Sequence, residues 1–437
     1  MKGEEIARLV GGEFSGSPSQ DISSFTFDSR EVKEGDLFIP LKGLRDGHLF
    51  IEEALKRGAR GSLTERELTP PPGRFVIRVR DSFEAFKSIA RHRRSSFGGR
   101  VVAVTGSVGK STTKELLFHL FSPFISAYRN RKSFNNEIGV TYTLANLPPD
   151  AELLIQEVGT SAPGEVASLK ELVRPHISVV TAVELAHAEG FGSFEAVRDE
   201  KLSLTPGVEF AVVPHPFASL SKARETLTFG KEGDVRLTSL ETSPEGSSFT
   251  VEAFGRRLEL FTPVPGLSIV NASLVAVGVA HLLEIPLSEL PHLIREFSPP
   301  SGRLRIERLG STVLIDDSYN ANPASFKNAI EVLSLFELER VAVVGQMLEL
   351  GPYSRQEHFK LGRLLNSAGV SLLVAFGPET LPTVEAFRGK KFYFSDREEL
   401  LDFFSSLPLD GKAILVKGSR GNRLERVCQI IRERLKS

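Results

Sequence analysis

Short apolar runs recur through the chain, and longer amphipathic segments separate them. Runs that are apolar on both faces are typical of buried parallel strands, and the segments between them have the spacing of helices. Apolar and polar residues instead alternate on either side of Gly255-Arg256, which predicts a hairpin appended to the sheet. The runs in the middle of the chain span residues 101–104, 153–155, 177–180 and 211–213, and the hairpin strands span 249–254 and 257–261.

The same alternation of strands and helices returns after the break at Pro299-Pro300-Ser301-Gly302. Three further apolar runs, at residues 341–344, 372–376 and 414–416, lead to Gly345, Gly377 and Gly418. A glycine at the carboxyl end of a strand lies on the edge where open α/β sheets bind ligands, although a simple tight turn is an equal alternative for each. The pattern predicts a Rossmann-like, doubly wound sheet.

Residues 1–97 mix short strands, at 37–41 and 75–79, with helices such as 50–57, and so predict a small α/β module. The chain has 437 residues, too many for one hydrophobic core. We therefore expect an α/β protein of three domains, at residues 1–97, 98–300 and 301–437.

Composition narrows the class of protein. The formal net charge is -1, which gives no electrostatic reason to expect nucleic acid or a membrane surface as a partner. No apolar run is long enough to span a bilayer, and the charged N-terminal segment does not read as a signal peptide. Cys428 is the single cysteine, which excludes an intramolecular disulfide framework and a cysteine-based zinc site. These features predict a cytoplasmic protein.

Residues 101–112 carry the strongest chemical signal. An apolar strand runs into Gly106-Ser107-Val108-Gly109, and Lys110-Ser111-Thr112 then opens a helix. Such a turn wraps backbone N–H groups around polyphosphate, places an ammonium on the phosphate oxygens and offers a hydroxyl to Mg²⁺. Val104 stands where the full pattern has a glycine, so the signal is the shorter form of the motif. A plain strand-to-helix turn is the alternative.

Candidate metal ligands follow the other central strands. Ser111 and Glu157 are oxygen donors of the kind Mg²⁺ prefers, and Glu157 comes directly after a strand. His187 follows the next strand, and Lys201 lies on an expected helix over 194–204. Position in the sequence leaves alternatives open for three of these residues. Glu157 could be a solvated loop residue, His187 a structural histidine and Lys201 a surface lysine.

Polar residues gather after the strand at 312–315. Asp316-Asp317-Ser318-Tyr319-Asn320-Ala321-Asn322-Pro323 holds two acids and two amides, more than a turn needs. These side chains could bind ribose hydroxyls or an incoming amine, and a structural turn is the competing reading.

Taken in order, these motifs resemble those of the Mur ligases from about residue 25 to residue 420. The phosphate loop is common to that family, whereas the blocks at 187–192, 319–323 and 345–351 resemble one member of it. The motifs are Asp28-Ser29-Arg30, Gly35-Asp36-Leu37-Phe38, Asp46-Gly47-His48, 105–112, Asn135-Asn136-Glu137-Ile138-Gly139, Glu157-Val158-Gly159, 186–193, 316–323 and 345–351.

The resemblance implies an ATP- and Mg²⁺-dependent amide ligase of peptidoglycan synthesis, and we expect the protein to be a monomer. Its substrates would be UDP-N-acetylmuramoyl-tripeptide, held by the first domain, and D-alanyl-D-alanine, presented by the third. Lys110, His187 and Lys201 would be catalytic, with Ser111 and Glu157 at one Mg²⁺ and His187 with a carbamylated Lys201 at a second. The implied nucleotide contacts are Thr105, Gly106, Ser107, Val108, Gly109, Lys110, Ser111, Thr112, Asn271, Arg303 and Asp317. The implied substrate contacts are Ser29, Arg30, Asn135, Asn136, Asn320 and Asn322.

Two departures from the family pattern stand out. Gly266-Leu267-Ser268-Ile269-Val270-Asn271 lacks the usual His-Asn pair near the adenine, and Gln346 replaces a common aspartate. Three alternatives stay open: a sister ligase that adds a single amino acid, a folylpolyglutamate synthase, and a silent nucleotide-dependent binding module. The Asn-Ala-Asn-Pro block disfavours the sister ligase, and the motifs between Asp28 and His48 disfavour the folylpolyglutamate synthase. The joint presence of Glu157, His187 and Lys201 disfavours the silent binding module.

Overall fold

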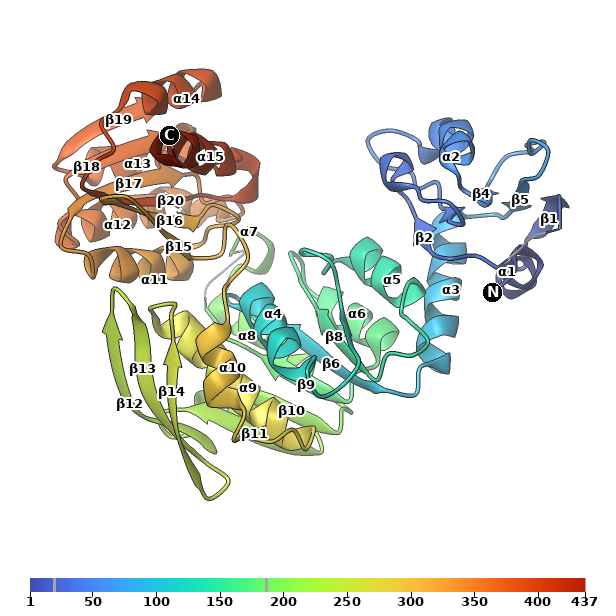
Figure 1. The fold of residues 1–437 in the computed structure, drawn as a ribbon, viewed down its shortest axis with the longest axis horizontal. Coiled ribbons are helices and arrows are strands. Elements are labelled where there is room, and N and C mark those ends of the chain that lie inside the picture. Colours follow the sequence, from blue (N-terminus) through green and yellow to red (C-terminus); the bar gives the residue numbers. More distant parts are fainter. Residues whose placement is uncertain (19–20, 185–187, 437) are drawn as a thin grey trace. The chain divides into compact units, whose positions relative to one another are not determined.

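The computed structural model describes residues 1–18, 21–184 and 188–436. The chain divides into two compact units. The first comprises Met1–Val101, Ser126–Val158 and Ser168–Arg174, and the second comprises Val102–Ile125, Gly159–Ala167 and Pro175–Ser437. Helices and strands alternate along both units (Figure 1). The predicted division into three domains stays a prediction.

The first unit contains a five-stranded sheet in the order β1-β5-β4-β3-β2. β1 runs antiparallel to β5, and the other neighbours are parallel. The unit also holds the parallel pair β7 and β8, and α3 packs against α5 (Figure 1). Its elements are α1 (Gly3–Val10), β1 (Glu13–Gly16), β2 (Phe25–Thr26), η1 (Ser29–Glu31), β3 (Leu37–Phe38), η2 (Gly47–Phe50), α2 (Ile51–Arg57), β4 (Gly61–Thr64), β5 (Phe75–Arg78), α3 (Ser82–Ser96), β7 (Ala127–Arg129), α5 (Glu137–Ala145), β8 (Leu153–Glu157) and most of α6 (Glu165–Val173).

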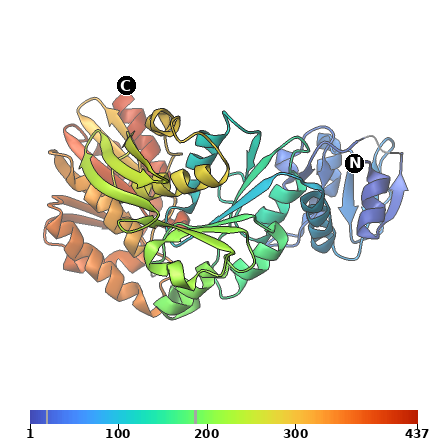
Figure 2. The ribbon, with the colours of Figure 1, turned by 90° about the horizontal axis from the view of Figure 1, so that it is seen from below.

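In the second unit, β6, β9, β10, β11 and β12 form parallel pairs, and β12, β13 and β14 continue antiparallel. These long antiparallel strands are yellow-green in Figure 2. The elements are β6 (Arg100–Thr105), α4 (Lys110–Phe121), β9 (Ile177–Val180), α7 (Ala188–Phe191), α8 (Phe194–Leu202), β10 (Phe210–Pro214), η3 (His215–Leu220), β11 (Glu225–Gly230), β12 (Val235–Ser243), β13 (Gly246–Ala253), β14 (Arg256–Thr262), α9 (Leu267–Leu282) and α10 (Leu290–Glu296).

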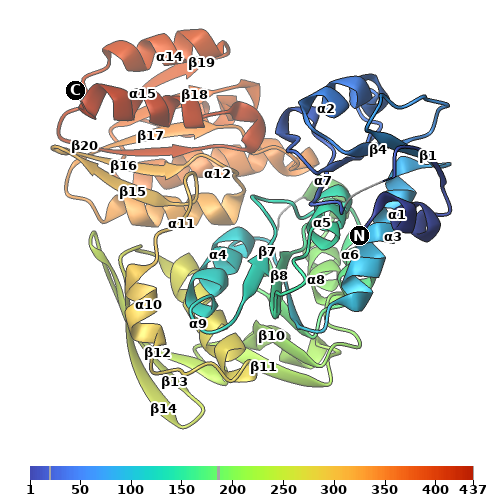
Figure 3. The same cartoon turned by 45° about the vertical axis from the view of Figure 1, so that its right-hand side comes forward.

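The second unit also holds a six-stranded sheet in the order β15-β16-β20-β17-β18-β19, parallel except for β15. Helices α11 and α12 lie on one face, and α14 and α15 lie on the other (Figure 3). The elements are β15 (Arg305–Leu309), β16 (Thr312–Asp317), α11 (Pro323–Ser334), β17 (Glu339–Gly345), η4 (Gly351–Tyr353), α12 (Ser354–Ser367), β18 (Leu372–Phe376), η5 (Pro378–Thr380), α13 (Leu381–Ala386), β19 (Lys390–Phe394), α14 (Arg397–Ser406), β20 (Lys412–Lys417), η6 (Arg420–Asn422) and α15 (Glu425–Lys436).

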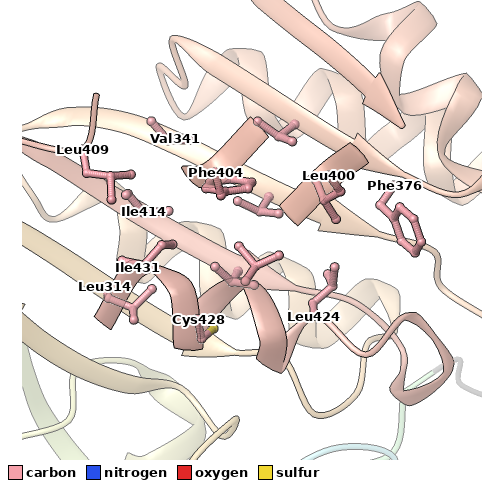
Figure 4. Close-up of a cluster of buried hydrophobic side chains, with 14 of the residues drawn as sticks. Leu314, Val341, Phe376, Leu400, Phe404, Leu409, Ile414, Leu424, Cys428 and Ile431 are labelled. Atoms are coloured by element: carbon pink, nitrogen blue, oxygen red, sulfur yellow. The ribbon is translucent and has the colours of Figure 1, made fainter. Parts of the chain in front are cut away.

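A hydrophobic core lies between this sheet and the layer of α14 and α15 (Figure 4). Leu314, Val341 and Ile414 from the strands pack against Phe404 of α14 and Ile431 of α15. Each of these side chains is buried, and burial of a large apolar side chain contributes about 1.5 to 3 kcal/mol to folding. These contacts join one face of the sheet to the two helices.

The predicted α/β class, the mostly parallel central sheet, the hairpin and the doubly wound third section are confirmed. β7, β12 and β15 are among the strands that the apolar runs did not predict. Those strands carry many partly or fully exposed residues, because they lie at sheet edges or outside the parallel core, and so they lack a continuous apolar run. No helix in the described ranges combines the length and apolar character that crossing a membrane requires.

Candidate active site

The predicted phosphate loop connects β6 to α4. β6 is buried from Val101 to Thr105, and the turn after it depends on two glycines with positive φ, Gly106 at 146° and Gly109 at 82°. α4 begins at Lys110, and the first N–H groups of a helix have no carbonyl partner within it. Lys110 Nζ donates a hydrogen bond of 2.8 Å to the Gly106 carbonyl, so its ammonium lies over the loop. A helix N-terminus beside an ammonium suits an anionic ligand.

Neighbouring segments hold this loop in shape. Thr181 Oγ1 donates to the Val108 carbonyl at 2.5 Å. Ser107 N–H donates to Ala182 O at 2.9 Å, and Ser107 Oγ donates to Glu184 O at 2.8 Å and accepts from Glu184 N–H at 3.0 Å. Ser107 therefore ties the loop to the segment after β9. The N–H and hydroxyl of Ser107 thus support the shape of the loop. The predicted contact of Ser107 with nucleotide stays a prediction.

Gly106→Ala should damage the loop. A Cβ at this position would lie 2.1 Å from Thr181 Oγ1 and 3.0 Å from Ala182 N, and the φ of 146° disfavours any L side chain. We expect a loss of about 1 to 3 kcal/mol in unfolding free energy, with at least a tenfold loss of ATP affinity, because backbone strain and a clash act together. Thermal unfolding and ATP titration would measure both.

Gly411→Ala is the matched control for that variant. Gly411 also has positive φ, at 70°, but a Cβ there would meet nothing within 4 Å. It therefore reports backbone strain without the clash. Equal ATP affinity in the two variants would contradict the role assigned to Gly106.

Lys201 is the most unusual charged residue of the second unit. It lies near the end of α8, its side chain is fully buried, and its Nζ makes no hydrogen bond to any residue that the structure describes. Burial and, to a smaller extent, the nearby charge of Lys110 lower the pKa of Lys201 to about 7, although Glu200 and Glu165 partly oppose both effects. The alternative interpretation from the sequence, that Lys201 is a solvated surface lysine, is therefore wrong. The site holds a lysine that is partly neutral near pH 7.

Glu200, next to Lys201, does not form an ion pair with it. Its carboxylate accepts hydrogen bonds from Gly164 N–H at 2.7 Å, Val166 N–H at 2.8 Å and Thr160 Oγ1 at 3.2 Å. These bonds fasten α8 to the segment at 160–166. Glu200 was missed in the sequence, where nothing distinguishes it from a solvent-exposed helix residue.

In the first unit, Glu157 ends β8 and is almost fully buried. Its Oε1 accepts a hydrogen bond of 2.8 Å from Asn135 Nδ2, and its N–H donates to Asn130 Oδ1 at 2.8 Å. Asn136 caps α5, because its Oδ1 accepts from Gly139 N–H at 3.0 Å. The structure thus brings Asn135 and Glu157 together and gives Asn136 a local structural contact.

Ser29 and Arg30 lie in the short helix η1 of the same unit. Arg30 Nε and Nη2 donate to the two oxygens of Asp28, at 2.9 and 2.7 Å. Those hydrogen bonds lower the pKa of Asp28, against a smaller opposing effect of burial. The Arg30 side chain remains largely exposed, and Ser29 Oγ lies 3.4 Å from Glu53 Oε2. Arg30 could therefore reach an anionic ligand.

The two aspartates at the end of β16 have separate contacts, since adjacent strand residues face opposite sides of a sheet. Asp316 Oδ2 accepts a hydrogen bond from Arg432 Nη2 at 2.6 Å on the α15 side. Asp317 Oδ1 accepts from Leu304 N–H at 3.0 Å, and its Oδ2 accepts from Lys417 Nζ at 2.5 Å. Burial lowers the pKa of Lys417, although Asp317 opposes this. Both oxygens of Asp317 are therefore engaged, and its predicted contact with ribose stays a prediction.

The Asn-Ala-Asn-Pro block is partly a helix cap. Asn322 Oδ1 accepts from Ser325 N–H at 2.8 Å and opens α11. Asn322 Nδ2 also donates to the Ser107 carbonyl at 3.4 Å, so this block reaches the phosphate loop. Asn320 is exposed, and its Oδ1 accepts from Ala321 N–H at 2.9 Å.

Two further predicted nucleotide contacts, Asn271 and Arg303, lie in α9 and in the segment just before β15. Asn271 is partly buried in the early turns of α9, whose Ser268 Oγ lies 3.8 Å from where a Cβ of Gly109 would stand. The Arg303 guanidinium lies 4.0 Å from the Tyr319 ring centre, in the segment between the two sheets. His187 lies outside the described residues.

Sequence reasoning missed the residues that support the block at 345–351. Asn422 Oδ1 accepts from Gln346 N–H at 3.0 Å, and Asn422 Nδ2 donates to the Gln346 carbonyl at 3.0 Å. Met347 N–H donates to His358 Nε2 at 3.0 Å. Burial lowers the pKa of His358 and so favours the neutral ring that this bond requires. The Gln346 amide itself lies within this local network, with its Oε1 accepting from Glu379 N–H at 3.2 Å.

Comparison with known proteins agrees with this arrangement. Residues 104–280 match the Mur ligase middle domain, and residues 302–420 match the Mur ligase glutamate ligase domain. A UDP-N-acetylmuramoyl-tripeptide--D-alanyl-D-alanine ligase of Synechocystis is 31% identical, over 91% of this chain and 89% of the relative.

Solved structures extend the comparison to the fold. A crystal structure of MurF from Acinetobacter baumannii superposes with a TM-score of 0.89 at 27% identity, covering 98% of each chain. The MurF ligase of Thermotoga maritima in complex with ADP gives a TM-score of 0.82 at 30% identity, covering 94% of this chain and 98% of that one. From its sequence and its fold together, the chain belongs to the Mur ligase family.

Proposed function

We propose that this chain is an ATP-dependent ligase that joins D-alanyl-D-alanine to UDP-N-acetylmuramoyl-tripeptide in peptidoglycan synthesis. The observation that carries the proposal is that one unit holds both the phosphate loop, in the shorter form of its motif, and Lys201, a buried amine that has no hydrogen-bond partner among the described residues. A module that only bound nucleotide would have no use for such a lysine, since burying a charged amine is unfavourable. Full-length similarity to ligases of this name supports the same conclusion.

The reaction must join a carboxylate to an amine, which is unfavourable in water without activation. The terminal carboxylate of the tripeptide attacks the γ-phosphoryl group of ATP, and the γ–β bridging bond breaks to release ADP and leave an acyl phosphate. The dipeptide amine then attacks the acyl carbon, and phosphate leaves as the amine loses a proton. Phosphoryl transfer of this kind depends on positioning and charge neutralisation rather than on a protein nucleophile.

Residues of the phosphate loop perform the first part of that task. The N–H groups at the start of α4 and the Lys110 ammonium hold the β and γ oxygens of ATP. Ser111 and Glu157 offer oxygen ligands to Mg²⁺, which when bound neutralises phosphate charge. Each of the two side chains is buried in its own unit and carries a donor oxygen of the kind that Mg²⁺ prefers.

Lys201 contributes as a carbamate. A neutral amine attacks carbon dioxide, forms an N–C bond and loses one proton, which leaves an anionic oxygen pair in place of an ammonium. The depressed pKa of Lys201, about 7, keeps part of the amine neutral at physiological pH, and the carbamate would relieve the repulsion from Lys110. With His187, the carbamate oxygens suit a second Mg²⁺.

The remaining predicted contacts complete the proposal. Asn271, Arg303 and Asp317 serve the nucleotide, and Ser29 and Arg30 serve the uridine diphosphate. Asn135 and Asn136 contact phosphate or substrate, and Asn320 and Asn322 lie near the incoming dipeptide. Three domains, a monomeric state and a cytoplasmic location belong to the same proposal.

Phosphate release in the presence of ATP and UDP-N-acetylmuramoyl-tripeptide, with and without D-alanyl-D-alanine, tests this function. We expect release to depend on the dipeptide. Release that needs a single amino acid instead would identify a sister ligase, and release driven by a folate substrate would identify a folylpolyglutamate synthase. ATP binding without turnover on any of these would identify a silent binding module.

A further inference from the structure

The incoming dipeptide carries a negative charge that the protein has to bind. This inference rests on the proposed function. D-alanyl-D-alanine has a free carboxylate at the end opposite to its reacting amine. Removing a carboxylate from water is unfavourable unless a cation and hydrogen-bond donors replace the water. A site that binds the dipeptide therefore needs a cation, and an arginine fits a carboxylate best because its donors form a planar fork.

Two cations near the carboxyl ends of β16 and β20 are already paired with carboxylates. Lys417 is buried, and its Nζ donates to Asp317 Oδ2 at 2.5 Å and to Asn320 O at 2.9 Å. Arg432 binds Glu307 Oε1 at 2.5 Å and Asp316 Oδ2 at 2.6 Å. The charge of each is neutralised inside the protein, so neither is available for a ligand.

Arg420 is in a different situation. It opens η6, two residues beyond Gly418, which follows the end of β20, and its side chain is 61% exposed. Its guanidinium lies 5.3 Å from the centre of the Tyr319 ring, one residue before Asn320. The Arg303 guanidinium lies 4.0 Å from the same ring centre. Contact with the ring face orients the Arg420 guanidinium without neutralising its charge.

The present partner of Arg420 does not prevent this binding. Arg420 Nη1 lies 3.2 Å from Glu425 Oε1, in an exposed pair. Exposed ion pairs are worth about 0 to 1 kcal/mol, and a guanidinium has five donors. Contact with an aromatic face leaves the in-plane N–H groups free to point at a ligand.

The backbone that carries Arg420 is firmly anchored. Ser419 N–H donates to Gln346 O at 2.9 Å, and Ser419 Oγ donates to Ala321 O at 3.3 Å and accepts from Leu348 N–H at 3.0 Å. Asn422 Nδ2 donates to Ser419 O at 2.8 Å. Arg420 is thus held against the two segments that the resemblance assigned to one family member, at 319–323 and 345–351. Such anchoring pre-organises a binding residue.

We infer that Arg420 binds the free carboxylate of the incoming dipeptide, with Tyr319 as the surface that orients its guanidinium. The residue then sets the specificity of the ligase for an amine substrate with an anionic end. Arg303, at the same ring, stays assigned to the nucleotide.

The test compares D-alanyl-D-alanine with its C-terminal amide, which keeps the amine and both methyl groups but has no charge. The wild-type protein should prefer the acid by about 10 to 100-fold in kcat/KM, the size expected for a hydrogen bond to a charged group. Arg420→Gln should lose that factor for the acid, mostly through KM, and should change the amide by less than about threefold. Arg420→Lys should recover part of the preference, because it restores charge without the fork.

Arg426→Gln is the matched control, since Arg426 is also an exposed arginine near the start of α15 and pairs with Glu398 at 3.4 Å. It should keep the full preference for the acid. The KM for ATP shows whether Arg420 binds the dipeptide carboxylate or a phosphate of ATP. We expect this KM to be unchanged in Arg420→Gln. A higher KM for ATP, with the preference for the acid intact, would overturn the inference.

Equal use of acid and amide by the wild-type protein would also overturn it, as would an equal loss on both substrates in Arg420→Gln. Neither result touches the proposed function, because dipeptide-dependent turnover would persist. The proposed function fails only if the wild-type protein shows no such turnover with either dipeptide.

Discussion

Lys201→Met should abolish dipeptide-dependent phosphate release and, at the same time, stabilise the fold. We expect turnover to fall by about 10³-fold, the effect of removing a group that stabilises developing charge in a buried site. Methionine keeps the length and apolar stem of lysine but cannot form a carbamate. The fold should tolerate it, because the Lys201 side chain is fully buried and its Nζ has no hydrogen-bond partner among the described residues.

The gain in stability has a defined dependence on pH. Lys201 has a pKa of about 7 in the folded protein against 10.5 as an unperturbed lysine. Between these values the unfolded chain binds the proton and the folded one does not, so the folded state loses stability as pH falls from 10.5 to 7. Below about pH 7 the whole penalty is present. Lys201→Met removes it, and we expect a gain of about 3 to 5 kcal/mol at pH 7 that vanishes above about pH 10.5.

Chemical denaturation in carbonate-free buffer at pH 7 and pH 10 would measure that gain, and phosphate release would measure the activity. Lys231→Met is the control, because Lys231 is exposed and should change neither quantity. Labelled bicarbonate should give a carbamate carbon signal in the wild-type protein that Lys201→Met lacks. A destabilised variant, or one that keeps its turnover, would contradict the role assigned to Lys201.

Lys110→Ala should remove both nucleotide binding and turnover. The Lys110 ammonium lies over the phosphate loop, 2.8 Å from the Gly106 carbonyl, and no other lysine is part of that loop. We expect a loss of at least about 10³-fold in turnover, because phosphoryl transfer relies on charge neutralisation. Titration with a fluorescent ATP analogue and the phosphate assay would measure the two effects.

The same variant carries a second, independent readout. The charge of Lys110 is one cause of the lowered pKa of Lys201, so removing it should raise that pKa. Carbamate formation should then require a higher pH than in the wild-type protein. Lys222→Ala, at an exposed lysine, is the control and should leave both readouts unchanged. Unimpaired dipeptide addition by Lys110→Ala would remove the basis of the proposed enzyme.

Local patterns were readable without the structure. The phosphate loop, the parallel strands and the hairpin depend on neighbouring residues, such as Gly106 and Gly109 with their positive φ, so their geometry follows from short segments. The motif blocks and their order were likewise visible. Edge strands such as β15 were not, because a partly exposed strand has no continuous apolar run.

Side-chain roles that depend on distant partners were decided by the tertiary structure. Asp316 and Asp317 look alike in the sequence, yet one binds Arg432 and the other binds Lys417, about a hundred residues away along the chain. Asn322 proved to be a helix cap that also reaches Ser107.

Lys201 shows most clearly the difference between what the sequence reveals and what only folding decides. The sequence by itself determined the fold class, the phosphate loop and which residues could do chemistry, since these are properties of residue type and short spacing. Only the tertiary structure decided that Lys201 is buried beside the charge of Lys110 and that Glu200 binds elsewhere. A pKa depends on burial and on charges brought near by folding, and neither is encoded in the adjacent residues.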